Sequence, residues 1–124
     1  MGIDLELHSA RPAHRDWRKS RATLLRGSYE HGDALAELIG SFRRLGVAGR
    51  LAGVDPYGDT LMNEQEAAAA LREIQEIRES RESEEIRESR DDFGLRQLDA
   101  LDELAGILEQ CAATPGSYVW FAGD

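Results

Sequence analysis

Two aspartates and two amide side chains in the middle of this chain are close enough in sequence to share one site. Asp55 and Asp59 enclose a Pro-Tyr-Gly segment, and Asn63 and Gln65 follow where a helical pattern begins. Side-chain oxygens of this kind bind hard cations, and a pair of carboxylates can do acid–base chemistry when burial raises one pKa. The stretch could bind a metal, carry catalysis, contact a partner, or form only a turn.

The spacing argues against a metal site. A calcium loop of the EF-hand type needs oxygen ligands at its first, third and fifth positions and a glycine at its sixth. Counted from Asp55, the third position is Tyr57 and the sixth is Thr60, while the glycine falls at Gly58. The histidines are scattered and form no H-x3-H pair for zinc. We therefore expect no metal and no cofactor.

Turn chemistry explains much of the stretch. Asp55 before a proline starts a turn, Pro56 fixes φ, and Gly58 is expected to supply a positive φ. The chain has no phosphate-binding glycine loop and no G-x-S-x-G motif, so we expect no catalytic residues. Tyr57 is left with two alternatives, an interface contact or packing over the edge of the core.

Strands are expected at both ends of the chain. Residues 3–8 alternate strictly between apolar and polar, which predicts a strand with one face on a core and one in water. Residues 118–121 are apolar and aromatic, typical of a strand covered in part on both faces. We expect these strands to pair in one small sheet, with room for a third near 50–54, covered by three to four helices. The predicted fold class is α+β.

Three helices are indicated by apolar residues at helical spacing. They cover about 33–45, about 63–80 and about 92–112. Asp33 and Asn63 are the predicted N-caps of the first two, and Gly46 is suited to end the first. Cys111 falls on the apolar side of the third helix, which predicts a buried, unreactive thiol.

The length is that of one domain, 1–124. Two charged segments interrupt the pattern of helices and strands within it. A basic cluster spans 11–26, where Trp17, Arg21, Leu24 and Leu25 have the spacing of a short helix. A near-repeat, EIRESRE then EIRESRD, makes 78–91 a charged stretch that we expect to be solvent-exposed. The alternative for each is a binding surface, for nucleic acid or for a partner.

Charge favours a protein partner over nucleic acid. The formal net charge is −9, and residues 55–124 hold eighteen acids against six arginines. Phosphate contacts need cationic side chains, whereas an acidic surface steers a basic protein. No apolar run is long enough to span a membrane, and the first residues lack the pattern of a secretory signal. We expect a cytoplasmic protein with no membrane association.

The segment DPYGDTLMNEQE and the terminal VWFAGD resemble those of small, largely uncharacterised bacterial proteins, some of which are similar to immunity proteins of polymorphic toxin systems. The resemblance covers about a third of the chain, and the matching positions are Asp55, Pro56, Tyr57, Gly58, Asp59, Thr60, Asn63, Gln65, Phe121, Gly123 and Asp124. It implies a protein that binds and blocks another protein without chemistry of its own.

Three functional hypotheses remain open at this stage. The first is a non-enzymatic, acidic protein-binding module, such as an immunity-type inhibitor of a bacterial toxin, with partner contacts at Asp55, Tyr57, Asp59, Asn63, Gln65 and Asp124. The second is a small enzyme or ligand-binding domain that uses Asp55, Asp59 and Asn63 around a pocket. The third is a self-associating structural module built on the charged helix near 72–92.

Overall fold

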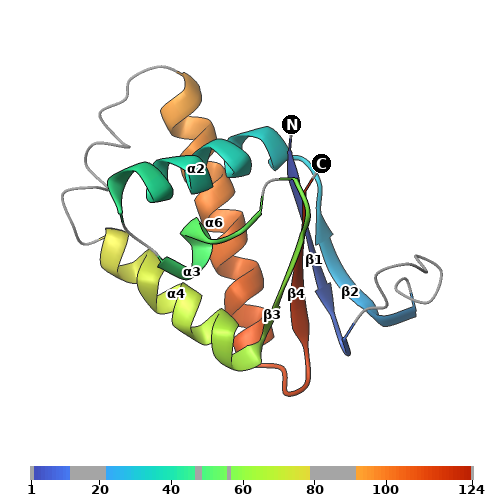
Figure 1. Cartoon of the computed structure of the whole chain (residues 1–124). Helices are drawn as coiled ribbons and strands as arrows, with labels where there is room; N and C mark the ends of the chain where they lie inside the picture. Colours follow the sequence, from blue (N-terminus) through green and yellow to red (C-terminus); the bar gives the residue numbers. More distant parts are fainter. Residues whose placement is uncertain (1, 12–21, 47–48, 56, 79–91, 124) are drawn as a thin grey trace.

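The chain forms one antiparallel sheet with helices on one of its faces. The computed structural model describes residues 2–11, 22–46, 49–55, 57–78 and 92–123. Within them, the strands are β1 (Ile3–His8), β2 (Leu24–Ser28), β3 (Asp59–Asn63) and β4 (Tyr118–Gly123), and the helices are α2 (Gly32–Leu45), α3 (Gly49–Ala52), α4 (Glu64–Arg78) and α6 (Asp92–Ala112). The sheet order is β2-β1-β4-β3, and the helices lie together on one side of it (Figure 1). The α+β class is confirmed.

The two terminal strands pair at the centre of the sheet, as the sequence predicts. The register of β1 against β4 runs from Ile3 opposite Gly123 to His8 opposite Tyr118. The apolar residues of β1 face the helices and are at most 2% exposed. Pairing the ends of the chain brings the start of β1 beside the end of β4 (Figure 1).

The third strand was expected in the wrong place. Residues 49–52 form the short helix α3, and Val54 donates its backbone N–H to the carbonyl of Leu51 at 3.1 Å. Leu51 and Val54 are both buried, and their three-residue spacing suits a helical turn better than a strand. The strand beside β4 is instead β3, directly before the helix that begins at Glu64.

The opposite edge of the sheet also differs from the prediction. Leu24 and Leu25, assigned to a short helix from their spacing, lie in β2, while Trp17 and Arg21 fall outside the described residues. Arg26 points toward the helices, where it donates hydrogen bonds to Glu103 at 3.1 Å and Gln110 at 3.3 Å on α6. These long-range contacts, absent from any local pattern, help to hold β2 in the sheet.

The three long helices are confirmed to within one or two residues. Gly46 ends α2 in the left-handed region, with φ of 71°. Asp33 is not the N-cap: that position belongs to His31, which makes no side-chain capping bond, and Asp33 lies in the first turn. The predicted N-cap of α4 is correct, because the backbone N–H of Glu66 donates to Oδ1 of Asn63 at 2.8 Å.

One apolar core fills the space between the sheet and the helices. Its largest fully buried members include Phe42 of α2, Ile74 of α4, Leu104 of α6 and Phe121 of β4. One face of the sheet and the apolar sides of three helices enclose this core. The other face of the sheet has no helix over it among the described residues (Figure 1).

The charged segment 78–91 was predicted to be solvent-exposed. Apart from Arg78, the last residue of α4, it lies outside the described residues, as does most of the basic cluster at 11–26.

Candidate functional site

The residues proposed from the sequence lie at the two ends of β3. Asp55, Tyr57 and Asp59 are at its start, whereas Asn63 and Gln65 are at its end. A rise of about 3.3 Å per residue separates Asp59 from Asn63 by roughly 13 Å along the strand. The strand therefore holds Asp55 and Asp59 apart from Asn63, and they do not surround one pocket. Asp124 lies outside the described residues.

The loop before β3 is fixed by backbone contacts. Tyr57 donates its backbone N–H to Oδ1 of Asp55 at 2.9 Å, which makes an Asx turn. Gly58 does not adopt the positive φ that the sequence predicts. Its lack of a side chain leaves room for Asp55, because a Cβ on Gly58 would lie 2.7 Å from Oδ2 of Asp55 and that carboxylate would have to shift. The side chain of Asp55 is thus engaged in building the turn.

A side chain from α2 braces the same loop. The Arg43 guanidinium donates to the carbonyl of Ala52 at 2.9 and 3.0 Å and to that of Val54 at 3.1 Å. These bonds satisfy carbonyls at the end of α3, where a helix leaves acceptors without intrahelical donors. Tyr57 projects from this braced loop and is 66% exposed, so most of its surface faces solvent rather than the core.

The other end of β3 forms a capping box and a shallow hollow. Asn63 donates its backbone N–H to Oε1 of Glu66 at 3.3 Å, the reciprocal of the capping bond that Asn63 accepts. The hollow beside it has a volume of about 210 Å³ and is lined by Asn63, Glu64, Gln65, Gly116, Ser117 and Tyr118. Its Glu64 carboxylate accepts the N–H of Gly116 at 3.2 Å, which leaves Gln65 as the exposed polar side chain there.

The face of the sheet away from the helices is a further candidate binding surface. Strand register places Gly27, Glu6, Trp120 and Leu61 in one row across all four strands. Parallel rows place Asp4 beside Ala122 and Asp59, and His8 beside Tyr118 and Asn63. Two of the exposed large hydrophobic residues, Leu25 at 48% and Tyr29 at 54%, belong to β2 and its C-terminal extension. We call this surface the open face.

Sequence reasoning missed Leu25 and Tyr29. The stretch from Leu24 to Tyr29 alternates in burial, with Leu25, Gly27 and Tyr29 more exposed than Leu24, Arg26 and Ser28. Period-two alternation signals a strand. It was hidden in the sequence because an arginine occupies a position that faces the helices and a glycine occupies one that faces solvent.

A chain of hydrogen bonds crosses the open face. Tyr29 donates its hydroxyl to Oε2 of Glu6 at 2.7 Å, and Oε1 of Glu6 lies 2.9 Å from Nε2 of His8. Nδ1 of His8 lies 2.9 Å from the Thr23 hydroxyl. Because a carboxylate only accepts, Nε2 carries the proton, and in the neutral imidazole the Thr23 hydroxyl donates to Nδ1. His8 was expected on a solvated face, yet it is fully buried.

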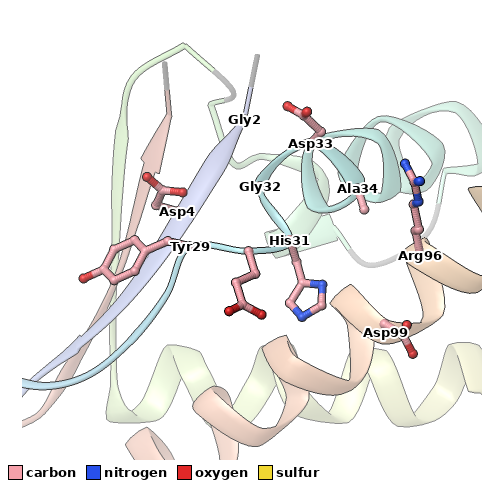
Figure 2. Close-up of a pocket in the computed structure, with 10 residues that line it drawn as sticks. Gly2, Asp4, Tyr29, His31, Gly32, Asp33, Ala34, Arg96 and Asp99 are labelled. Atoms are coloured by element: carbon pink, nitrogen blue, oxygen red, sulfur yellow. The ribbon is translucent and has the colours of Figure 1, made fainter.

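A hollow of about 430 Å³ opens where β1, the start of α2 and α6 meet (Figure 2). Asp4 and Tyr29 form its sheet side, and Arg96 and Asp99 form its α6 side. Between them lie the first residues of α2 and the segment that leads into it, His31 to Ala34. Its carboxylates outnumber its guanidinium groups four to one: Asp4, Glu30, Asp33 and Asp99 against Arg96.

The described residues offer little for metal or thiol chemistry. Among them, no group of three or more His, Cys, Asp or Glu side chains is placed to hold a metal ion. Burial raises the pKa of the Cys111 thiol, which Ser117 opposes only in part by donating a hydrogen bond to the sulfur at 3.3 Å. The burial of Cys111 expected from the sequence is confirmed, and a raised thiol pKa is typical of a thiol with low reactivity.

No family model matches this sequence, and no curated protein or solved structure matches it either. Within the described part of the chain, every helix is too short or too polar to cross a membrane.

Proposed function

We propose that this chain is a non-enzymatic protein-binding module whose open face binds a basic protein. The observation that carries the proposal is the exposure of Tyr29 on a sheet face without a helical cover, with exposed Leu25 nearby at the bulge of the edge strand β2. Exposed aromatic and aliphatic side chains that gather on one face are characteristic of interaction sites. Half-buried Leu61 and Trp120 extend the same surface across the sheet.

The negative charge of the open face indicates that the partner is basic. Of the described residues in the three rows of the open face, Asp4, Glu6 and Asp59 are acidic and none is a lysine or arginine. The net charge of −9 adds a long-range field of the same sign. Such a field accelerates the approach of a cationic partner and disfavours nucleic acid.

The role that best combines these features is that of an immunity protein, which binds and blocks a toxin. The resembling segments support it, since DPYGDT leads into β3 and VWFAG forms most of β4, two neighbouring strands of the open face. Tyr57, exposed beside the start of β3, extends the proposed contact surface. The proposal assigns the protein to the cytoplasm, where its lone thiol needs no disulfide partner.

The two other hypotheses have less support. A ligand-binding or catalytic pocket would require Asp55, Asp59 and Asn63 to converge, whereas β3 separates them. Self-association was based on the charged helix near 72–92, and the described part of that region is the end of α4 and Asp92, the first residue of α6. Neither hypothesis is supported by a structural feature comparable to the open face.

The test uses the product of the gene immediately upstream as the candidate partner. We expect the two purified proteins to bind each other, co-expression to restore growth inhibited by that product, and affinity to fall as salt rises. Leu25→Lys should weaken binding at least about tenfold, because it removes apolar contact and opposes a basic surface.

The matched control is Gln75→Lys, which makes the same kind of side chain at an exposed position of α4. It changes the net charge by the same amount but lies on the helical side, so it should alter affinity by no more than about twofold. Equal losses for the two variants would argue against the open face. A complete lack of binding and protection would refute the proposed partner.

A further inference from the structure

We propose that Tyr29 and the carboxylates beside it form a binding site for one arginine side chain of the partner. The inference rests on the proposed function and names the chemistry of its central contact. An arginine is specified because its planar guanidinium both stacks on an aromatic ring and donates hydrogen bonds to neighbouring carboxylates.

The ring of Tyr29 is fixed in place rather than free on the surface. A Cβ built on Gly27 would lie 2.5 Å from the Tyr29 hydroxyl and 2.6 Å from Cε2 and Cζ, so the ring packs directly on the backbone of Gly27. The hydroxyl is anchored on Glu6 at 2.7 Å. One side of the ring is therefore occupied by β2, and the residue remains 54% exposed.

The hydrogen-bond chain keeps Glu6 in position to anchor the ring. Glu6 uses one carboxylate oxygen for Tyr29 and the other for His8, whose second ring nitrogen is bonded to Thr23. Both imidazole nitrogens of a fully buried side chain are thus engaged, and the carboxylate cannot turn without breaking one of these bonds. A phenol that donates to a carboxylate also has a more electron-rich ring, which favours a cation above it.

Charge beside the ring fits a guanidinium. Continuing the register of β1 and β2 by one residue places Asp4 across from Tyr29. Asp4 and Tyr29 together form the sheet side of the acidic hollow (Figure 2). A guanidinium over the ring would lie beside Asp4 at the edge of this hollow, whose lining contains more carboxylates than guanidinium groups.

The experiment uses a small probe, so it does not depend on finding the partner. N-acetyl-arginine methylamide is titrated into the full chain, and the aromatic resonances of Tyr29 are followed by NMR. The neutral isostere N-acetyl-citrulline methylamide is the matched control. We expect saturable shifts with the arginine probe and at least about fivefold weaker binding of the citrulline compound.

Two variants test the contribution of the Tyr29 ring. Tyr29→Leu should weaken the arginine probe about fivefold, followed through the backbone amide of Glu30. Gly27→Ala should weaken it about threefold without touching the probe, because the added methyl displaces the ring. Circular dichroism and thermal unfolding confirm that each variant is folded, and Gly27→Ala is at an exposed position where only the Tyr29 side chain must move.

Equal affinity for the arginine and citrulline probes, or unchanged affinity in Tyr29→Leu, would overturn the proposal. That result differs from failure of the proposed function. If Leu25→Lys abolishes partner binding while the affinity of the arginine probe is unchanged in Tyr29→Leu, only the arginine site is wrong. If the probe binds at Tyr29 while the upstream product does not bind, the site stands and the partner is wrong.

Discussion

The two faces of the sheet are made by the same strands and have opposite chemistry. On β1, Leu5 faces the helices and is 2% exposed, whereas its neighbour Glu6 faces away and accepts bonds from Tyr29 and His8. On β4, Phe121 is fully buried and the adjacent Trp120 is half-buried. One face is joined by apolar packing, the other by hydrogen bonds and aromatic contacts.

The difference separates stability from recognition. Apolar burial is non-directional and contributes most of the folding free energy, so the helix-covered face should dominate stability. The open face contributes exposed rings and carboxylates whose positions matter more than their burial. Substitutions on the first face should change unfolding, and most of those on the second should change binding.

The largest expected effect is on the covered face. Phe121→Ala should lower the free energy of unfolding by about 3–5 kcal/mol, because it removes a fully buried ring and leaves a cavity. Tyr57→Ala is the matched aromatic truncation at a residue 66% exposed, and it should change stability by less than about 0.5 kcal/mol. Urea titration followed by circular dichroism measures both. Similar losses in the two variants would contradict the division between faces.

Sequence periodicity was sufficient where burial is set by local spacing. Leu35, Leu38, Ile39 and Phe42 mark the covered side of α2, and alternation marks β1. It failed for β2 and β3, whose places depend on partners distant in sequence. Arg26 on β2 bonds to Glu103, and Leu61 on β3 lies opposite Trp120. Strand formation depends on such neighbours more than helix formation does.

The candidate site was less predictable than the fold for the same reason. Tyr57, Asp59 and Gln65 were chosen from one continuous segment, but the segment is a strand with its two flanks, and its polar residues are distributed along it. Tyr29 and Glu6 are separated by more than twenty positions and meet only because β1 pairs with β2. No local pattern contains that information.

His8 is an exception to this division between a buried face and an exposed face. It lies on the open face yet is fully buried, with both ring nitrogens hydrogen-bonded. His8→Leu should lower stability by about 1–3 kcal/mol, since Glu6 and Thr23 each lose a partner in a covered position. Thermal unfolding measures the loss.

The control for His8 is Tyr29→Phe, which removes one hydroxyl at the exposed end of the same chain of bonds. It should cost less than about 1 kcal/mol, because water replaces the missing partner of Glu6. If Tyr29→Phe were the more destabilising of the two, the open face would be a structural element rather than a binding surface.

A smaller effect is expected at the end of β3, where the strand passes into the helical layer. Asn63→Ala should cost about 1 kcal/mol through loss of the capping bond to Glu66. Gln65→Ala, at an exposed position two residues later, should be near neutral in stability. Denaturant unfolding separates them. Equal stability of the two variants would mean that the capping box contributes nothing to α4.

The smallest effect is confined to alkaline pH and probes the covered face through Cys111. Burial raises the pKa of its thiol above the ordinary value of 9.0, and Glu64 adds to the rise. The unfolded chain therefore releases the thiol proton at a lower pH than the folded chain does. Above about pH 9 the unfolded state binds fewer protons, so stability falls as pH rises through the folded pKa.

Cys111→Ala removes this contribution and leaves the other titrating groups in place. The stability difference between the parent chain and the variant should be constant below about pH 8 and should shift in favour of the variant at higher pH. Unfolding curves recorded at intervals between pH 7 and 10 measure the shift. Parallel pH profiles would show that the thiol ionises as readily inside the fold as in water. The apolar layer over that end of α6 would then be open to solvent, against the full burial found for Cys111 and its neighbour Leu108.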